Sequence, residues 1–166
     1  MKFKLRPYQE EASKKAVEFF LDKKKNWNAL EVLPTASGKS LILADIAARL
    51  KDKVLVFSPT KEILEQNYKK YCSYGFDNAS IYSASFKSKE ISDVTFATIG
   101  SVKGHPELFT DFKYILIDEV HLVKPESGMY KEFLDKLKSK VIGLTATPFR
   151  LYSYQNYGSI LKFLTR

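Results

Sequence analysis

Several residue types that would indicate a different class of protein are scarce in this chain of 166 residues. Its single cysteine, Cys72, allows no internal disulfide and gives no metal-ligand cluster. No apolar run approaches the roughly 20 residues of a membrane-spanning helix, and charges interrupt the start where a secretion signal would need an apolar core. These absences predict a soluble intracellular protein, cytoplasmic in location and without a membrane partner.

Acidic residues are also fewer than basic ones, 19 against 27, which leaves a formal net charge of +8. A basic excess favours a polyanionic partner, but a solvated basic helix face gives the same count, so charge alone does not decide between them. Hydrophobic residues make up 45% of the chain and aromatic residues 14%, which excludes a disordered or fibrous protein. The length suits one domain with a substantial core.

Apolar runs of strand length alternate with amphipathic stretches of helix length. The predicted strands are residues 28–33, 53–58, 79–83, 93–98, 114–118 and 141–147. The predicted helices are residues 7–21, 39–50, 61–74 and 128–140. Such alternation predicts right-handed βαβ units and a single-domain α/β sandwich of three layers around a mostly parallel sheet. In such sheets ligands bind beyond the carboxyl ends of the strands, and polar residues cluster at these positions here.

Residues 33–40, LPTASGKS, follow one predicted strand and lead into a helix. Gly38 allows the backbone to approach a phosphate, Lys39 neutralises its charge, and the Ser40 hydroxyl is suited to ligate magnesium. The Gly-Lys-Ser triplet alone also occurs by chance, but its position between strand and helix favours a phosphate-binding loop. Leu33 and Ala36 stand where such loops often have small residues, and Ala36 is tolerated unless its φ angle is positive.

Two acids, Asp118 and Glu119, come directly after the apolar run YILI. Acids at the end of a buried strand are costly unless they meet a cation or water. We therefore expect Asp118 to hold Mg²⁺ and Glu119 to orient and deprotonate an attacking water. The alternative is an ordinary strand end with solvated acids.

Six segments then occur in the order and spacing of a known family: LRPYQ, LPTASGKS, SPTKEILEQN, ATIGS, DEVH and GLTATPFR. Together they resemble the ATP-binding first lobe of superfamily 2 helicases of the DEAD/DEAH-box group. The first and last segments are most similar to the branch that includes type III restriction subunits, UvsW-type phage helicases and RadD-type repair helicases. The resemblance implies a RecA-like P-loop NTPase fold over residues 1–150, with residues 151–166 as a connector or the start of a second lobe.

The resemblance also implies roles for the residues that match its motifs. Arg6 and Gln9 would recognise adenine, because a Gln amide pairs with adenine N6 and N7 at once. Without the other motifs, Gln9 would be read as an exposed helix residue. The residues that would bind ATP through the loop are Thr35, Ala36, Ser37, Gly38, Lys39 and Ser40. The residues implied to be catalytic are Lys39, Asp118 and Glu119. Magnesium would be bound by Ser40 and, through water, by Asp118.

Two further groups are assigned by the same resemblance. The residues expected to grip the sugar-phosphate backbone of nucleic acid are Pro59, Thr60, Lys61, Thr98, Gly100 and Ser101. Such contacts would be independent of base sequence, although the same residues also suit turns and helix caps. The residues expected to couple the nucleotide site to the nucleic-acid surface are His121, Thr145 and Thr147.

The implied function is the ATP-binding lobe of an ATP-dependent DNA helicase or translocase in repair, recombination or restriction. Its ligands would be ATP or ADP, Mg²⁺ and single-stranded or branched DNA, and we expect a monomer with a second RecA-like lobe in the same full-length chain. That lobe supplies an arginine finger worth about 10³–10⁵-fold in rate, so these 166 residues should hydrolyse ATP slowly and unwind nothing. The alternatives are an RNA helicase lobe and a stand-alone nucleotide- or nucleic-acid-binding adaptor module.

Overall fold

The computed structural model describes residues 4–25, 28–33, 38–120 and 129–145. Five of the predicted site residues lie outside these ranges, namely Thr35, Ala36, Ser37, His121 and Thr147. The predicted connector, residues 151–166, also lies outside the described residues.

A sheet of seven strands forms the centre of the described part of the chain, in the order β1-β7-β6-β2-β5-β3-β4. The strands are β1 Ala29–Val32, β2 Val54–Phe57, β3 Ala79–Ser83, β4 Ser88–Lys89, β5 Val94–Ala97, β6 Tyr114–Ile117 and β7 Lys140–Thr145. Neighbouring strands are parallel except for β3 and β4, which are antiparallel. The predicted mostly parallel sheet is confirmed, and the short edge strand β4 was not predicted.

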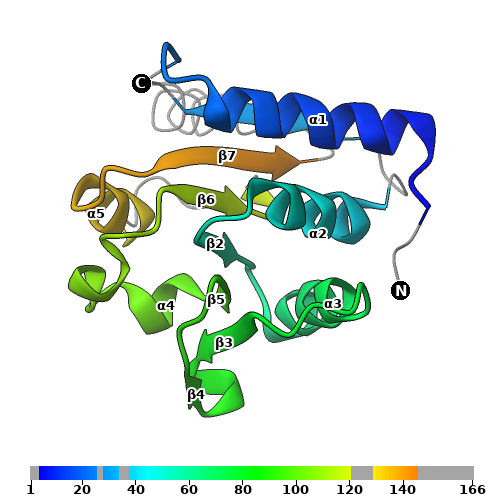
Figure 1. Cartoon of the computed structure of the whole chain (residues 1–166). Coiled ribbons are helices and arrows are strands. Elements are labelled where there is room, and N and C mark those ends of the chain that lie inside the picture. The colour runs from blue at the N-terminus through cyan, green and yellow to red at the C-terminus, as the bar shows by residue number, and fades with distance from the viewer. Residues whose placement is uncertain (1–3, 26–27, 34–37, 121–128, 146–166) are drawn as a thin grey trace, which may run out of the picture.

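Helices cover both faces of this sheet, which confirms the three-layer arrangement (Figure 1). One face carries α1 Pro7–Leu21, α2 Lys39–Leu50 and α3 Lys61–Cys72. The other carries α4 Ile99–Val102, α5 Met129–Asp135 and the 3₁₀ turn η2 Pro106–Phe109, while η1 Ala84–Phe86 joins β3 to β4. Among the described residues, none of the helices is both long enough and apolar enough to cross a membrane.

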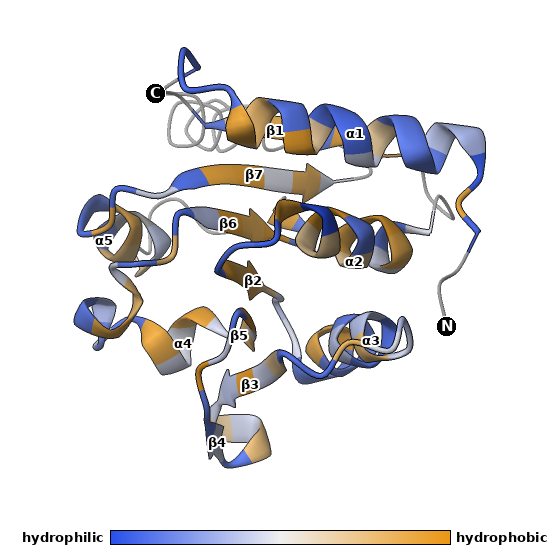
Figure 2. Cartoon of the chain, in the orientation of Figure 1, coloured by the Kyte–Doolittle hydropathy of each residue, from blue (hydrophilic) through white to orange (hydrophobic). Residues whose placement is uncertain are grey.

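The core divides into two apolar clusters, one on each face of the sheet. All four side chains of β2 are fully buried, with Val54 and Val56 in one cluster and Leu55 and Phe57 in the other. Each such side chain contributes about 1.5–3 kcal/mol when removed from water. Figure 2 shows hydrophobic residues concentrated in β2, β6 and α2. Burial on both faces explains why these strands have near-continuous apolar sequences rather than alternating ones.

The parallel register brings the carboxyl ends of β2 and β6 to the same edge of the sheet. Phe57 pairs with Ile117, and the backbone N–H of Asp118 donates to the carbonyl of Phe57 at 2.9 Å. At the end of β1, the N–H of Leu33 donates to the Thr145 carbonyl at the end of β7 at 2.8 Å. The segments that carry the predicted motifs therefore leave the sheet side by side.

A partly buried acid, Glu31, lies in β1. Within the described part of the chain, the Oε1 atom of Glu31 is buried without a hydrogen-bond partner. Burial raises the pKa of Glu31 to about 7, and the nearby positive charge of Lys15 opposes this shift. The folded state therefore binds more protons than the unfolded state between about pH 4.5 and 7, so this residue lowers stability as the pH rises through that range.

We predict that Glu31→Gln stabilises the protein at pH 8, because the neutral amide does not have to ionise in an apolar environment. The expected gain in unfolding free energy is about 1–2 kcal/mol. This is less than the free energy that corresponds to the whole pKa difference between the folded and unfolded states, because the carboxyl group stays partly solvated. The gain should shrink as the pH falls toward 4.5, which urea denaturation at several pH values measures. Glu65→Gln, on the exposed face of α3, is the control. The account would be contradicted if the difference in unfolding free energy between wild type and Glu31→Gln were the same at every pH.

Candidate nucleotide site

The predicted phosphate-binding loop ends at a residue that only glycine occupies easily. Gly38 is the N-cap of α2 and has a φ angle of +78°, in the left-handed region. Its carbonyl accepts the N–H groups of Leu41 at 3.0 Å and Ile42 at 3.1 Å, so the helix begins at once. Lys39 and Ser40 are therefore the first helical residues of α2, where backbone N–H groups and the helix dipole favour a bound anion.

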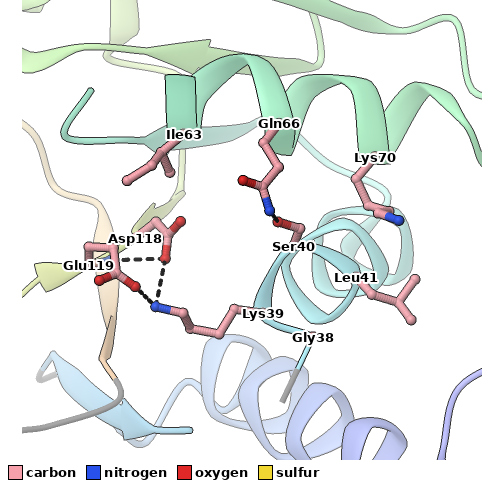
Figure 3. A pocket seen from close by; sticks show the side chains of 9 residues that line it. All are labelled: Gly38, Lys39, Ser40, Leu41, Ile63, Gln66, Lys70, Asp118 and Glu119. Carbon is pink, nitrogen blue, oxygen red and sulfur yellow. Dashed lines mark hydrogen bonds and ion pairs between the residues drawn. The ribbon is translucent and has the colours of Figure 1, made fainter. Parts of the chain in front are cut away.

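The Lys39 ammonium lies between the two acids that follow β6. It forms an ion pair with Glu119, and its Nζ atom is 3.7 Å from Oδ1 of Asp118. All three side chains are largely buried, with exposures of 19% for Lys39, 5% for Asp118 and 21% for Glu119. Figure 3 shows both carboxylates pointing toward the ammonium. The structure thus brings together the three residues predicted to be catalytic.

Glu119 has an unusual backbone conformation for a residue with a side chain. Its φ angle is +52°, which costs about 1–2 kcal/mol for a non-glycine residue. Its N–H donates to Oδ1 of Asp118 at 2.9 Å, which offsets part of this strain. Strained residues of this kind cluster at functional sites.

A buried amide that sequence reasoning did not identify connects the loop to these acids. Oδ1 of Asn67, in α3, accepts the hydroxyl of Ser40 at 2.8 Å. Its Nδ2 atom donates to Oδ2 of Asp118 at 2.9 Å and to the hydroxyl of Ser58 at 3.2 Å. On the exposed side of α3, the amide of Gln66 donates to the oxygen of Ser40 at 3.1 Å.

A pocket of about 560 Å³ opens in front of these groups, within the usual range for a small-molecule site. It is lined by Gly38, Lys39, Ser40, Leu41, Ile63, Gln66, Lys70, Asp118 and Glu119 (Figure 3). The described residues contain no cluster of three His, Cys, Asp or Glu that could hold a metal alone. The Ser40 hydroxyl and the Asp118 carboxylate do fit Mg²⁺, which prefers oxygen ligands and commonly binds through one or two carboxylates plus substrate phosphates.

Gln9 is buried beside Gly38, the last residue before α2. It is 6% exposed, so the alternative of an exposed helix residue is wrong. Its Oε1 atom accepts the N–H of Arg6 at 2.9 Å, which caps the start of α1. A Cβ added to Gly38 would lie 2.5 Å from Nε2 of Gln9, so the two predicted adenine and phosphate motifs are in close contact. The Arg6 residue itself is exposed, and adenine recognition by either residue stays a prediction.

The first predicted nucleic-acid segment, Pro59 to Lys61, follows β2 and leads into α3. The hydroxyl of Thr60 accepts the N–H of Ile63 at 3.2 Å and is therefore the N-cap of that helix. Lys61 is exposed and its Nζ atom lies 5.4 Å from the ring centroid of Phe86. The capping role is thus present, and a nucleic-acid contact by the same segment stays a prediction.

The second predicted segment lies after β5 and contains a cluster of hydroxyl groups. The Thr98 hydroxyl is 3.2 Å from that of Ser83 and 3.0 Å from that of Ser101. The Ser101 hydroxyl also accepts the N–H of Ala84 at 3.0 Å, and Gly100 lies between these residues in α4. Ser83 was missed because a serine at the end of a strand carries no distinctive local pattern.

Of the predicted coupling residues, Thr145 lies within the described part of the chain. It is fully buried as the last residue of β7. Through its carbonyl, which accepts the N–H of Leu33, Thr145 connects the end of β7 to the residue that follows β1. His121 and Thr147 lie outside the described residues.

Comparison with known proteins identifies the family. The sequence model of the family described as type III restriction enzyme, res subunit, matches residues 2–150, so this chain belongs to that family. The DNA 3'-5' translocase XPB2 of Sulfurisphaera tokodaii is 31% identical over 152 residues, which cover 90% of this chain and 32% of the relative. The ATP-dependent DNA helicase Hel308 of Methanocaldococcus jannaschii is 30% identical over 86% of this chain and 14% of its own length. The predicted relation to superfamily 2 helicases is confirmed.

Solved structures confirm the RecA-like fold. The UvsW helicase from bacteriophage T4 superposes with a TM-score of 0.73 at 20% identity, covering 98% of this chain and 58% of UvsW. The Sulfolobus solfataricus SWI2/SNF2 ATPase core, solved in complex with dsDNA, gives a TM-score of 0.75 at 24% identity. It covers 99% of this chain and 36% of that structure. The chain is therefore homologous to helicase and translocase ATPase domains and spans a minor part of the two relatives matched by sequence.

We predict that Gly38→Ala weakens nucleotide binding, because the added Cβ strains the backbone and displaces the Gln9 amide. The expected cost is about 1–2 kcal/mol from the positive φ angle alone, measured by thermal unfolding and by titration with fluorescent ADP. Gly104→Ala is the matched control, since an added Cβ there meets nothing within 4 Å. Equal stability and equal ADP affinity for the two variants would show that the Gly38 conformation is unimportant.

Proposed function

We propose that this chain is the ATP-binding lobe of an ATP-dependent DNA helicase or translocase. The observation that carries the proposal is the convergence of Lys39, Ser40, Asp118 and Glu119 on one pocket, in a chain homologous to helicase ATPase domains. The pocket lies at the carboxyl edge of a parallel sheet and at a helix N-terminus, which is where phosphates bind in such folds.

The ion pair of Lys39 indicates how the site would respond to ATP. A phosphate at the N-terminus of α2 would compete with Glu119 for the ammonium, because phosphate is also an anion and accepts further backbone N–H bonds there. Release from Lys39 would leave the Glu119 carboxylate available to orient a water and accept its proton as the water oxygen attacks the γ-phosphorus. The bond from the γ-phosphorus to the departing oxygen of ADP would break in the same displacement. Bound Mg²⁺ would supply charge neutralisation at the β- and γ-phosphates. The residues placed to hold the ion are Ser40 and, through water, Asp118.

The nucleic-acid surface would lie at the same edge of the sheet, beyond β2, β5 and β3. The hydroxyls of Thr98 and Ser101 and the Lys61 ammonium are groups that bind a sugar-phosphate backbone without reading its sequence. A net charge of +8 supports a polyanionic partner. DNA is preferred over RNA here because both sequence relatives are named for action on DNA.

Productive activity would need a second RecA-like lobe. The two sequence relatives extend well beyond the matched region, which covers 32% and 14% of their lengths. An arginine finger from such a lobe is worth about 10³–10⁵-fold in rate. We therefore infer weak nucleotide binding and slow hydrolysis by these residues alone. We further propose that the protein is a monomer and acts in the cytoplasm.

We predict that Lys39→Ala lowers ATP affinity about 10- to 100-fold, because it removes a charged contact worth about 1.5–3 kcal/mol. Glu119→Gln should keep ATP affinity within about threefold of wild type and lower turnover about 10²–10⁴-fold, as expected for loss of a general base. Titration with a fluorescent ATP analogue and single-turnover hydrolysis measure the two effects. Both are run with single-stranded DNA, branched DNA and RNA, each in turn.

The control is Lys69→Ala, which removes an exposed lysine of α3 that pairs with Glu65 away from the pocket. Unchanged ATP binding in Lys39→Ala would refute the nucleotide site. Rapid DNA-stimulated hydrolysis by the wild-type chain would instead refute the requirement for a second lobe, and stimulation by RNA alone would refute the preference for DNA.

A further inference from the structure

Asn67 occupies a position where the helical pattern calls for an apolar residue. The buried residues of α3 are Leu64, Asn67 and Tyr71, and Asn67 is 1% exposed. An amide buried in this way is costly unless it is hydrogen-bonded. Its bonds go to Ser40 and Asp118, which are both predicted magnesium ligands, and to Ser58.

The hydrogen-bond pattern fixes the orientation of the Asn67 amide. Its oxygen accepts from Ser40, and its two N–H groups point to Asp118 and Ser58. A flipped amide would place its oxygen against the Asp118 carboxylate, so two acceptors would face each other. The amide is therefore held in one orientation by partners on three separate segments of the chain.

This orientation also controls what Ser40 and Asp118 present to the pocket. The Ser40 hydroxyl donates its single hydrogen to Asn67, so its oxygen faces the pocket only as an acceptor. It accepts there from the Gln66 amide. Oδ2 of Asp118 is engaged by Asn67, while Oδ1 faces Lys39. Ser40 and Asp118 both line the pocket, and both carry oxygen acceptors, which are the ligands that Mg²⁺ prefers.

We propose that Asn67 is a positioning residue for magnesium: by bonding both groups, it holds the Ser40 hydroxyl and the Asp118 carboxylate in fixed positions, where they would bind a nucleotide-bound ion. This inference rests on the proposed nucleotide site. It assigns to α3 a part of that site that lies outside the phosphate loop and the acids after β6. Residues that orient metal ligands in this way typically change metal affinity about 10–100-fold when they are replaced.

The test is a magnesium titration of the 166-residue chain in the presence of fluorescent ADP. Asn67→Leu has a similar size but makes no hydrogen bonds, so the magnesium concentration at half-maximal effect should rise about 10-fold or more. ADP affinity in EDTA should stay within about twofold of wild type, because Asn67 does not line the pocket that receives the nucleotide. Circular dichroism and thermal unfolding establish that each variant is folded.

Leu64→Ala is the matched control, since it removes a fully buried side chain from the same face of α3 without touching the network. It should lower the unfolding temperature and leave the magnesium midpoint unchanged. Asn67→Ala gives the same test without added bulk and replaces Asn67→Leu if that variant does not fold.

The outcomes separate the two levels of the proposal. The positioning role would be overturned if a folded Asn67 variant kept the magnesium midpoint of the wild type. It would also be overturned if Leu64→Ala shifted the magnesium midpoint as much as the Asn67 variant does. The nucleotide site itself would be overturned if the ADP affinity of the wild type did not depend on magnesium and Lys39→Ala bound ADP with the same affinity.

Discussion

The parallel pairing of β6 with β2 on one side and β7 on the other is the constraint on which the site depends. Because parallel strands end at a common edge, it places Asp118 directly beside Ser58 and near the end of β7. β1 ends at the same edge, beside the end of β7, and Lys39 and Ser40 open the helix that follows it. No single segment contains the site, so its geometry is a property of the sheet register, and a slip of one residue would turn Asp118 to the opposite face.

Two kinds of interaction hold the side chains of the pocket: an ion pair between Lys39 and Glu119, and the hydrogen bonds of the Asn67 amide. In the proposed site the ion pair between Lys39 and Glu119 would be exchangeable, since a phosphate offers the same ammonium an alternative anionic partner. The Asn67 amide is uncharged and buried, and its oxygen and both N–H groups are hydrogen-bonded, so it would hold Ser40 and Asp118 in place while the ion pair changes. A nucleotide site would need both kinds of interaction. The Lys39 ammonium has to exchange its anionic partner when phosphate binds, while the predicted metal ligands Ser40 and Asp118 have to stay in place.

The sequence was informative where the physical signal is local. Buried strands such as Val54–Phe57, the Gly-Lys-Ser turn and the acids after β6 were all predictable from neighbouring residues. Asn67 was not, because its partners Ser40 and Asp118 are 27 and 51 residues away. Its one sequence signal was a polar residue on the apolar face of an amphipathic helix. The two-residue strand β4 and the Ser83 hydroxyl cluster likewise depend on contacts between distant segments.

The central claim is that nucleotide displaces Glu119 from Lys39 while the Asn67 bonds persist. The most direct test is a crystal structure of the chain with Mg²⁺ and a non-hydrolysable ATP analogue. We predict that the Lys39 ammonium contacts the phosphates, that Ser40 and Asp118 face the metal, and that Asn67 still bonds both residues. A structure in which Lys39 remains paired with Glu119 and the nucleotide lies outside this pocket would contradict the account.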